Sequence, residues 1–148
     1  MRNVFIRLLG VALVVIIMTS LPVLAKTNKT WGGLAIKGFD AVAYFKEGKA
    51  VKGNKDISFD YDGAKWLFAT VDHKELFIKE PSHYAPQYGG FCAFAVSQNS
   101  LADIDPAAWT VLNDKLYLNY NASISQKWNE KKDQYIKDAD QHWPQLEK

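Results

Sequence analysis

The chain has 148 residues, with 18 lysines and arginines against 16 aspartates and glutamates, and a formal net charge of +2. Both arginines, Arg2 and Arg7, lie near the start, so the chain from Lys26 onward has no arginine and no net charge. A neutral chain without guanidinium groups lacks both the basic field and the planar fork that grip phosphates. This composition argues against nucleic acid as a partner, and the length suits one domain with a core.

The first 25 residues have the order of a secretory signal. A basic start at Arg2 and Arg7 is followed by an apolar run from Leu8 to Met18, and Val23-Leu24-Ala25 precedes the expected cleavage. The run is shorter than the roughly 20 residues that a membrane-spanning helix needs. We expect a periplasmic or secreted protein with no stable membrane insertion after cleavage. The alternative is an uncleaved N-terminal membrane anchor.

A polar lead-in at 26–38 precedes the domain, and its first residues, Lys26 to Thr30, are expected to be flexible. Residues 39–45 contain Asp40, a residue type that often caps helices or forms turns. They predict either one helical turn or a short strand. The domain itself is expected to cover 39–148.

The next residues predict a hairpin followed by a helix. Ile57 to Tyr61 alternate apolar and polar side chains, which is typical of a half-buried strand. Asp62-Gly63 is a turn pair, and residues 65–69 read as the return strand. Thr70 can cap a helix over 71–80.

A second hairpin is predicted from Trp109 to Tyr120, with its turn at Asn113-Asp114. One last helix is expected to begin near Asn121 or Ser123 and to end at Pro144. Its large apolar residues recur at spacings of about four and seven, which places them on one face. The sequence therefore predicts a small single α+β domain of two β-hairpin plus helix units with a C-terminal amphipathic helix.

The segment 81–92 concentrates unusual residues. It holds two prolines, a Gly-Gly pair, three aromatic residues, a histidine and the only cysteine. Prolines and glycines shape the backbone, and aromatic walls with few polar groups are the usual form of ligand sites. We predict a small-ligand site here, with the candidate residues Tyr84, Gln87, Tyr88, Gly89, Gly90 and Cys92.

Cys92 leaves several possibilities open. A single cysteine in an exported protein is paired between chains, reactive, or buried and inert. Together with His73 and His83 it would form a ligand set suited to copper or zinc. With one of these histidines as base it could instead act as a nucleophile, although its apolar neighbours Phe91 and Ala93 would raise the pKa of the thiol and make it inert.

Residues from Asp40 to Cys92 resemble the YHS-domain family. The matching residues are Asp40-Ala41-Val42-Ala43-Tyr44-Phe45, Tyr61-Asp62-Gly63, Trp66-Leu67-Phe68, Leu76-Phe77 and Pro81-x-x-Tyr84. An exported, stand-alone branch of that family is similar through Tyr84-Ala85-Pro86-Gln87-Tyr88-Gly89-Gly90-Phe91-Cys92-Ala93, Pro106-x-x-Trp109 and Leu116-Tyr117-Leu118-Asn119-Tyr120. The resemblance implies a hairpin-plus-helix unit. Some members of the family lie beside copper-transport ATPases and handle metals, so the resemblance also raises metal binding as an expectation.

The chain departs from the metal-handling members of this family at their cysteines. Ala43 stands at the first cysteine position, and Ala69 and His73 stand at the other two. Of these three positions, only His73 could still coordinate a metal. The resulting hypothesis is non-catalytic binding of a metal ion, copper or zinc, or of a small ligand near Cys92. The alternatives are a thiol-dependent enzyme or redox sensor that uses Cys92, and a protein-interaction module of the cell envelope.

Overall fold

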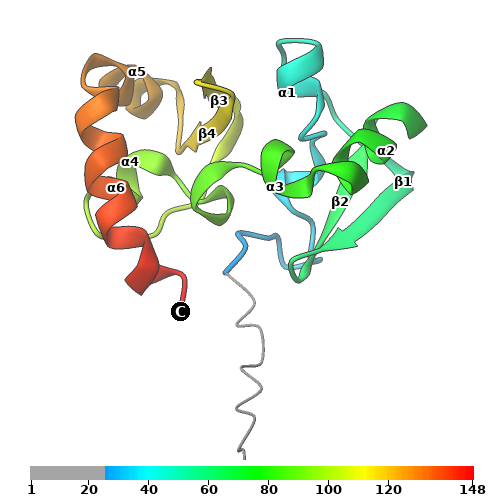
Figure 1. Ribbon diagram of the computed structural model, residues 1–148, viewed down its shortest axis with the longest axis horizontal. Helices are drawn as coiled ribbons and strands as arrows, with labels where there is room; N and C mark the ends of the chain where they lie inside the picture. The colour runs from blue at the N-terminus through cyan, green and yellow to red at the C-terminus, as the bar shows by residue number, and fades with distance from the viewer. Residues whose placement is uncertain (1–25) are drawn as a thin grey trace, which may run out of the picture.

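A computed structural model describes residues 26–148, and the predicted signal segment, 1–25, lies outside the described residues. Two antiparallel hairpins with associated helices form a small α+β domain, which confirms the predicted fold class (Figure 1). The segment that joins α3 to α4 crosses between the two hairpins in this view. The elements are η1 (Ile36–Gly38), α1 (Ala43–Lys46), β1 (Asn54–Tyr61), β2 (Ala64–Phe68), α2 (Val71–Lys79), α3 (Pro81–Tyr84), η2 (Gln87–Gly90), α4 (Ala93–Ser97), β3 (Asp105–Leu112), β4 (Lys115–Asn119), α5 (Ala122–Glu130) and α6 (Lys132–Leu146).

The first hairpin follows from its two-residue turn. Asp62 and Gly63 have φ of 50° and 73°, so that Tyr61 pairs with Ala64 across the turn. Positive φ at both positions is the geometry that matches the twist of paired strands, and Asp-Gly adopts it readily. After β2, the Thr70 hydroxyl accepts a hydrogen bond from the backbone N–H of His73 at 3.1 Å and caps α2. The predicted hairpin, cap and helix are confirmed.

The second unit repeats this plan. Asn113 and Asp114, with φ of 50° and 61°, make the turn between β3 and β4. The Asn121 side chain then accepts from the backbone N–H of Ile124 at 2.9 Å and caps α5. The predicted second hairpin and the predicted helix start are confirmed.

The prediction of one continuous last helix was wrong. Lys131, with φ of −138° and ψ of 37°, separates α5 from α6. This break lets Trp128 on α5 and Ala139 on α6 both reach the same buried cluster. Pro144 does not end the helix, because α6 runs on to Leu146 and the missing N–H of Pro144 removes only one hydrogen bond to the preceding turn.

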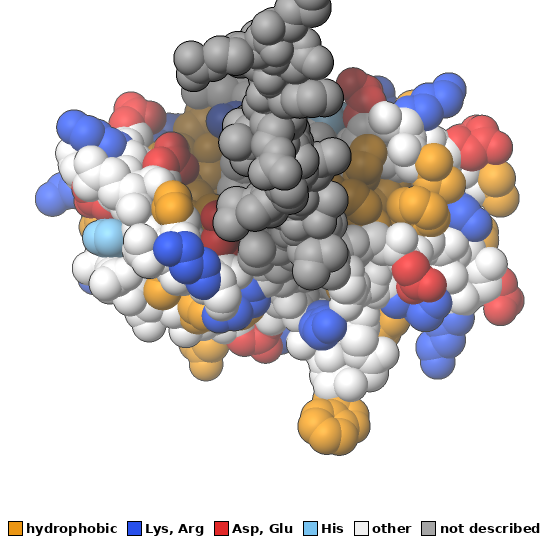
Figure 2. Space-filling view, turned by 60° about the horizontal axis from the view of Figure 1, so that its bottom comes forward, with side chains coloured by type: hydrophobic (Ala, Val, Ile, Leu, Met, Phe, Trp, Pro, Cys, Tyr) orange, Lys and Arg blue, Asp and Glu red, His pale blue; other side chains and the backbone are white. Residues whose placement is uncertain are grey.

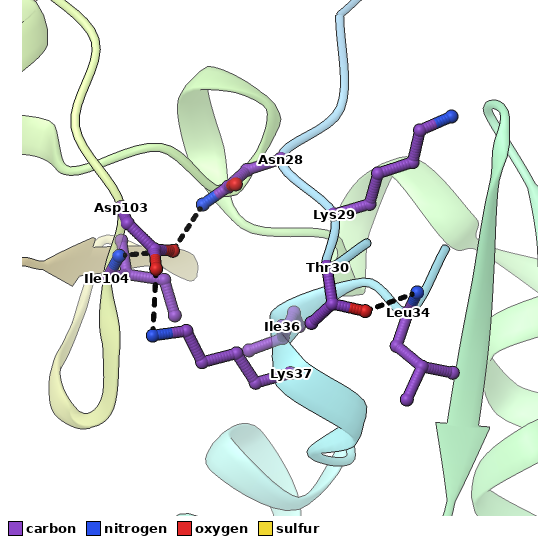
Figure 3. A pocket seen from close by; sticks show the side chains of 8 residues that line it. All are labelled: Asn28, Lys29, Thr30, Leu34, Ile36, Lys37, Asp103 and Ile104. Atoms are coloured by element: carbon purple, nitrogen blue, oxygen red, sulfur yellow. Dashed lines mark hydrogen bonds and ion pairs between the residues drawn. The ribbon is translucent and has the colours of Figure 1, made fainter. Parts of the chain in front are cut away.

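The predicted flexible lead-in is instead held by hydrogen bonds to both halves of the domain. The backbone N–H of Asn28 donates to the Gly89 carbonyl at 2.8 Å, and the Thr27 hydroxyl donates to the Asp62 carbonyl at 2.9 Å. Figure 3 shows Asn28 and Lys37 pointing at Asp103, which precedes β3. The lead-in is therefore an ordered part of the domain, bonded to both of its halves.

Figure 2 shows acidic and basic side chains interspersed over the face in view, as expected for a chain with no net charge after Lys26. The longest helix in the described part, α6, has 15 residues. Within residues 26–148, no helix has the length and apolar character needed to cross a membrane.

Candidate functional site

The backbone of the segment 81–92 bends sharply at its glycines. Tyr88, Gly89 and Gly90 all have positive φ, of 58°, 59° and 78°. A Cβ atom on Gly89 would collide with the carbonyl oxygen of Lys26 and would lie 3.2 Å from Cη2 of Trp143. Glycine is therefore needed at position 89 both for its dihedral angles and for the close approach of two other parts of the chain.

This bend helps to enclose a cavity of about 110 Å³. Three residues of the segment, Ala85, Pro86 and Gly89, line one side of it. The other sides come from the first hairpin, from α6 and from the lead-in. The lining residues outside the segment are Thr27, Tyr61, Asp62, Trp66 and Trp143.

Aromatic rings form much of the cavity wall. Tyr61 and Trp66 stand at an angle, with ring centroids 6.3 Å apart and planes inclined by 58°. The indole N–H of Trp66 donates to the Tyr61 carbonyl at 2.9 Å, which fixes this ring, and Trp66 is only 3% exposed. Trp143 closes the wall from α6, where it packs against Tyr88 and Phe91. The rings are thus set by hydrogen bonding and packing before any ligand arrives.

Two polar side chains face the same cavity. The Thr27 hydroxyl lies 2.9 Å from the carbonyl oxygen of Asp62 and 3.0 Å from its carboxylate Oδ2. Asp62 is the one charged side chain among the described residues that line the cavity. The site therefore combines aromatic walls with a single negative charge.

Cys92 lies outside this cavity and is 1% exposed. Its Sγ lies 3.6 Å from Oδ1 of Asn119 on β4. Burial raises the pKa of the Cys92 thiol, and backbone N–H groups nearby offset this only in part. Cys92 does line a second hollow, of about 260 Å³, together with Phe94, Ala95, Ala102, Tyr120 and Ile124.

The three residues predicted to bind a metal lie in different surroundings. The His73 ring lies 2.6 Å from the Asp40 carboxylate, whereas His83 packs beside Tyr84 and lies 3.4 Å from Asp114. Within residues 26–148, no three histidine, cysteine or acidic side chains are grouped so as to hold a metal ion. Cys92, His73 and His83 therefore do not form a shared ligand set.

The other predicted ligand residues mostly support the segment from within. Tyr84 is buried and packs edge-on against Phe45, and Gln87 is half-buried. The Tyr88 hydroxyl donates to Asp140 on α6 at 2.9 Å, and burial, followed by this hydrogen bond, raises the pKa of Tyr88.

Gly90 is also buried, and its carbonyl accepts from the Asn28 side chain at 3.1 Å. Of the six predicted ligand residues, only Gly89 faces the aromatic cavity, and Cys92 faces the second hollow.

Sequence reasoning missed the partners of Gly89. The sequence places Tyr61 and Asp62 only in a strand and its turn, and Trp66 and Trp143 are not among the predicted ligand residues. A local signal existed for Asp62, because a tight turn projects its residues away from the sheet. Nothing local indicated that Trp143 on the last helix would reach the same place.

The chain matches no family model, no curated protein and no solved structure in the comparisons made. The fold and the cavity together define a class, a small α+β domain with an aromatic pocket at a proline-glycine bend.

Proposed function

We propose that this chain is an exported YHS-like domain that binds a small molecule without transforming it. The export part rests on the residue order within 1–25, and the family part rests on the residues from Asp40 to Cys92. The observation that carries the binding function is the aromatic cavity at Pro86 and Gly89. The proposed site uses the segment 81–92 on its Gly89 side rather than at Cys92, and shares its wall with the first hairpin, α6 and the lead-in.

The surroundings of Cys92 and His73 favour binding over catalysis. A nucleophilic cysteine needs a lowered pKa and an adjacent base. Burial raises the pKa of Cys92, and its side-chain hydrogen-bond partner is the amide of Asn119. His73 is engaged by Asp40 through Nδ1. These groups act as parts of the scaffold.

The geometry does not favour binding of copper or zinc by Cys92, His73 and His83. A soft metal ion needs thiolate and imidazole ligands that converge on one point. Cys92, His73 and His83 lie in separate surroundings. We therefore propose that the ligand is a small molecule in the aromatic cavity and not a metal ion at these three residues.

The test uses the indole N–H signals of the five tryptophans in a ¹H–¹⁵N spectrum, assigned by single Trp→Phe variants. Purified protein is titrated with a library of small polar and aromatic fragments. Binding in the cavity should shift the Trp66 and Trp143 signals and leave those of Trp31, Trp109 and Trp128 in place.

A matched pair of variants checks the location. Ala85→Leu should fill the cavity and abolish these shifts, whereas Ala107→Leu, at an exposed position of β3, should not. If no fragment shifts Trp66 or Trp143, or if Ala85→Leu binds as well as the natural protein, the proposed function is wrong.

A further inference from the structure

The two hairpin-helix units correspond to each other residue by residue. The helix α2 begins at Val71 and α5 begins at Ala122, which is 51 residues later (122 − 71), and both helices are 9 residues long. Each cross-strand pair of the first hairpin recurs 51 residues later in the second, and so does the register shift in the first strand of each. The domain therefore contains one structural unit twice, and equivalent positions can be compared directly.

Cys92 holds the place in the second unit that Asp40 holds in the first. The backbone N–H of Asp40 donates to the Val51 carbonyl at 2.8 Å, and the backbone N–H of Cys92 donates to the Ala102 carbonyl at 3.0 Å. Each of the two residues lies just before a short helix, α1 or α4. Two side chains of different chemistry, a carboxylate and a thiol, thus occupy equivalent sites.

The backbone donors around these two side chains are equivalent as well. The Asp40 carboxylate accepts from the N–H groups two and three residues later, at 2.9 and 3.2 Å, and from the N–H of the residue that follows β2, at 2.8 Å. The N–H groups two and three residues after Cys92, and the N–H of the residue that follows β4, act on the Cys92 sulfur and favour its anionic form. These three donors belong to Phe94, Ala95 and Tyr120. The second unit thus has the same donor set that holds a carboxylate in the first.

One more donor beside the Cys92 sulfur has no acceptor. Asn119 is fully buried, and its Oδ1 lies 3.6 Å from Sγ and also accepts from the backbone N–H of Phe94. Its Nδ2, on the same amide, has no hydrogen-bond partner within residues 26–148. A buried donor without an acceptor costs free energy, and a thiol sulfur is only a weak acceptor. The surroundings of the sulfur therefore offer more donors than a thiol can use.

The hollow of about 260 Å³ that Cys92 helps to line gives a small oxidant a route to the sulfur. Hydrogen peroxide is uncharged and has about the size of two water molecules, or roughly 60 Å³. In the first unit, His73 bonds to the Asp40 carboxylate at 2.6 Å. Its counterpart 51 residues later (124 − 73) is Ile124, which lines the hollow. Oxygen atoms added to Cys92 would therefore be left to the backbone donors and to Asn119.

We infer that Cys92 is an oxidation site, and that peroxide converts its thiol to a sulfinate held by Asn119 Nδ2 and by the donors equivalent to those around Asp40. A sulfinate resembles a carboxylate, because both spread one negative charge over two oxygen atoms. Since Cys92 is the only cysteine, no second thiol of the chain can divert the oxidation into an internal disulfide. This modification needs no ligand in the aromatic cavity and goes beyond the proposed function.

The reaction consumes two molecules of hydrogen peroxide. The thiol first releases its proton to solvent, and the thiolate attacks one peroxide oxygen, so that an S–O bond forms, the O–O bond breaks and hydroxide leaves with the electron pair. A second peroxide transfers another oxygen atom to the sulfenate in the same way. The net products are the sulfinate, one proton and two water molecules. Burial keeps the thiolate fraction low, so the modification is slow and follows sustained exposure rather than a brief pulse.

Peroxide treatment followed by peptide mass spectrometry tests the inference. In the folded protein the Cys92 peptide should gain two oxygen atoms and stop, whereas in urea it should go on to the sulfonate, because nothing encloses the sulfur there. The only methionines, Met1 and Met18, lie far from this peptide and do not add to its mass. The urea midpoint of the sulfinated protein should lie within about 0.5 M of that of the reduced protein.

Three results of this experiment would overturn the inference. The first is that folded protein gains no oxygen at Cys92 under conditions that oxidise the thiol in urea. The second is that the folded protein goes on to the sulfonate as readily as the unfolded one. The third is that the sulfinated protein unfolds.

A matched pair of variants tests the donor set without any oxidation. Cys92→Asp places a carboxylate among these donors and should lower the urea midpoint by less than about 1 M. Ala93→Asp places the same charge at the next residue, which is also fully buried but packs in the apolar cluster with Trp128. It should lower the midpoint by at least about 2 M or unfold the protein. A loss for Cys92→Asp as large as that for Ala93→Asp would contradict the inference.

Discussion

Cys92 Sγ and Asn119 Oδ1 lie 3.6 Å apart in the interior, and both side chains are almost completely buried. The same oxygen accepts from the backbone N–H of Phe94 at 3.1 Å, so a side chain on β4 caps the start of α4. The amide Nδ2 of Asn119 has no hydrogen-bond partner within residues 26–148. The thiol is thus part of the contact between two elements and is not presented to solvent.

The buried thiol should react slowly. Because burial raises the pKa of Cys92, a smaller fraction is thiolate at neutral pH than for a free cysteine. We expect alkylation by iodoacetamide at pH 7.5 to be at least about 100-fold slower in the folded protein than in urea. Mass spectrometry over time measures both rates. A folded-state rate within about threefold of the unfolded rate would contradict this burial and revive the thiol-enzyme alternative.

A second buried contact joins three parts of the first unit. The Asp40 carboxylate is fully buried and accepts from the backbone N–H groups of Val42 at 2.9 Å and of Ala69 at 2.8 Å. It also lies 2.6 Å from Nδ1 of His73 on α2. This one side chain ties the start of α1, the end of β2 and the helix α2 together.

Asp40→Ala should therefore destabilise the protein severely. It would leave buried N–H donors and the His73 ring without their acceptor, which we expect to lower the free energy of unfolding by about 3 kcal/mol or more. Asp56→Ala, at an exposed position of β1, should change it by less than about 0.5 kcal/mol. Urea unfolding followed by circular dichroism measures both. Equal effects of the two variants would show that Asp40 has no special structural role.

The steric role of Gly89 can be separated from its dihedral role. Gly89 and Gly48 have similar φ, of 59° and 62°, but a Cβ atom on Gly48 would meet nothing within 4 Å. Gly48→Ala should lower the free energy of unfolding by about 1–2 kcal/mol, from backbone strain alone. Gly89→Ala should lower it by at least about 2 kcal/mol more, because its methyl group also collides with the Lys26 carbonyl. Equal losses in urea titrations would contradict the close approach at Gly89.

Acid should weaken the contact between the lead-in and Asp103. Burial by itself would raise the pKa of Asp103, but hydrogen bonds from Lys37, Ile104 and Asn28 outweigh it, so the pKa lies below its usual value. The folded state then binds fewer protons than the unfolded state, and this stabilisation is present above the usual carboxyl pKa and lost as the pH falls through the lowered one.

Asp103→Asn tests that dependence. Its stability deficit at pH 7 should stay below about 1 kcal/mol, because the Asp103 side chain is 56% exposed. The deficit should shrink toward zero when urea titrations are repeated near pH 2.5. A stability deficit that is the same at both pH values would show that it does not come from the ionised Asp103 carboxylate.

The elements that the sequence predicted well are those with local causes. The pairs Asp62-Gly63 and Asn113-Asp114 fix both hairpins by their own backbone preferences. Thr70 and Asn121 cap the helices that follow them, within three residues along the chain. Each of these signals can be read in a short window.

The break at Lys131 had no such local signal. Its neighbours are good helix formers, and the apolar spacing continues from Trp128 to Tyr135 as in one helix. In the structure Trp128 from α5 and Ala139 from α6 pack into one cluster on either side of the break. Tertiary packing overrides local propensity in such cases.

The candidate site could be located only in part. Ala85, Pro86 and Gly89 of the segment 81–92 line the aromatic cavity. The apolar neighbours of Cys92 indicated a thiol with a raised pKa, as the structure has it. The partners of Gly89 could not be foreseen, because Lys26, Tyr61 and Trp143 come from three distant parts of the chain. Contacts of this kind follow from the packing of the whole domain.

The most direct test of the central claim is a crystal structure of the protein soaked with the fragments that shift the Trp66 and Trp143 signals. The account predicts ligand density enclosed by Tyr61, Trp66, Pro86 and Trp143, within contact distance of the Asp62 carboxylate. Density found only in the hollow beside Cys92, with solvent alone between the three rings, would contradict it.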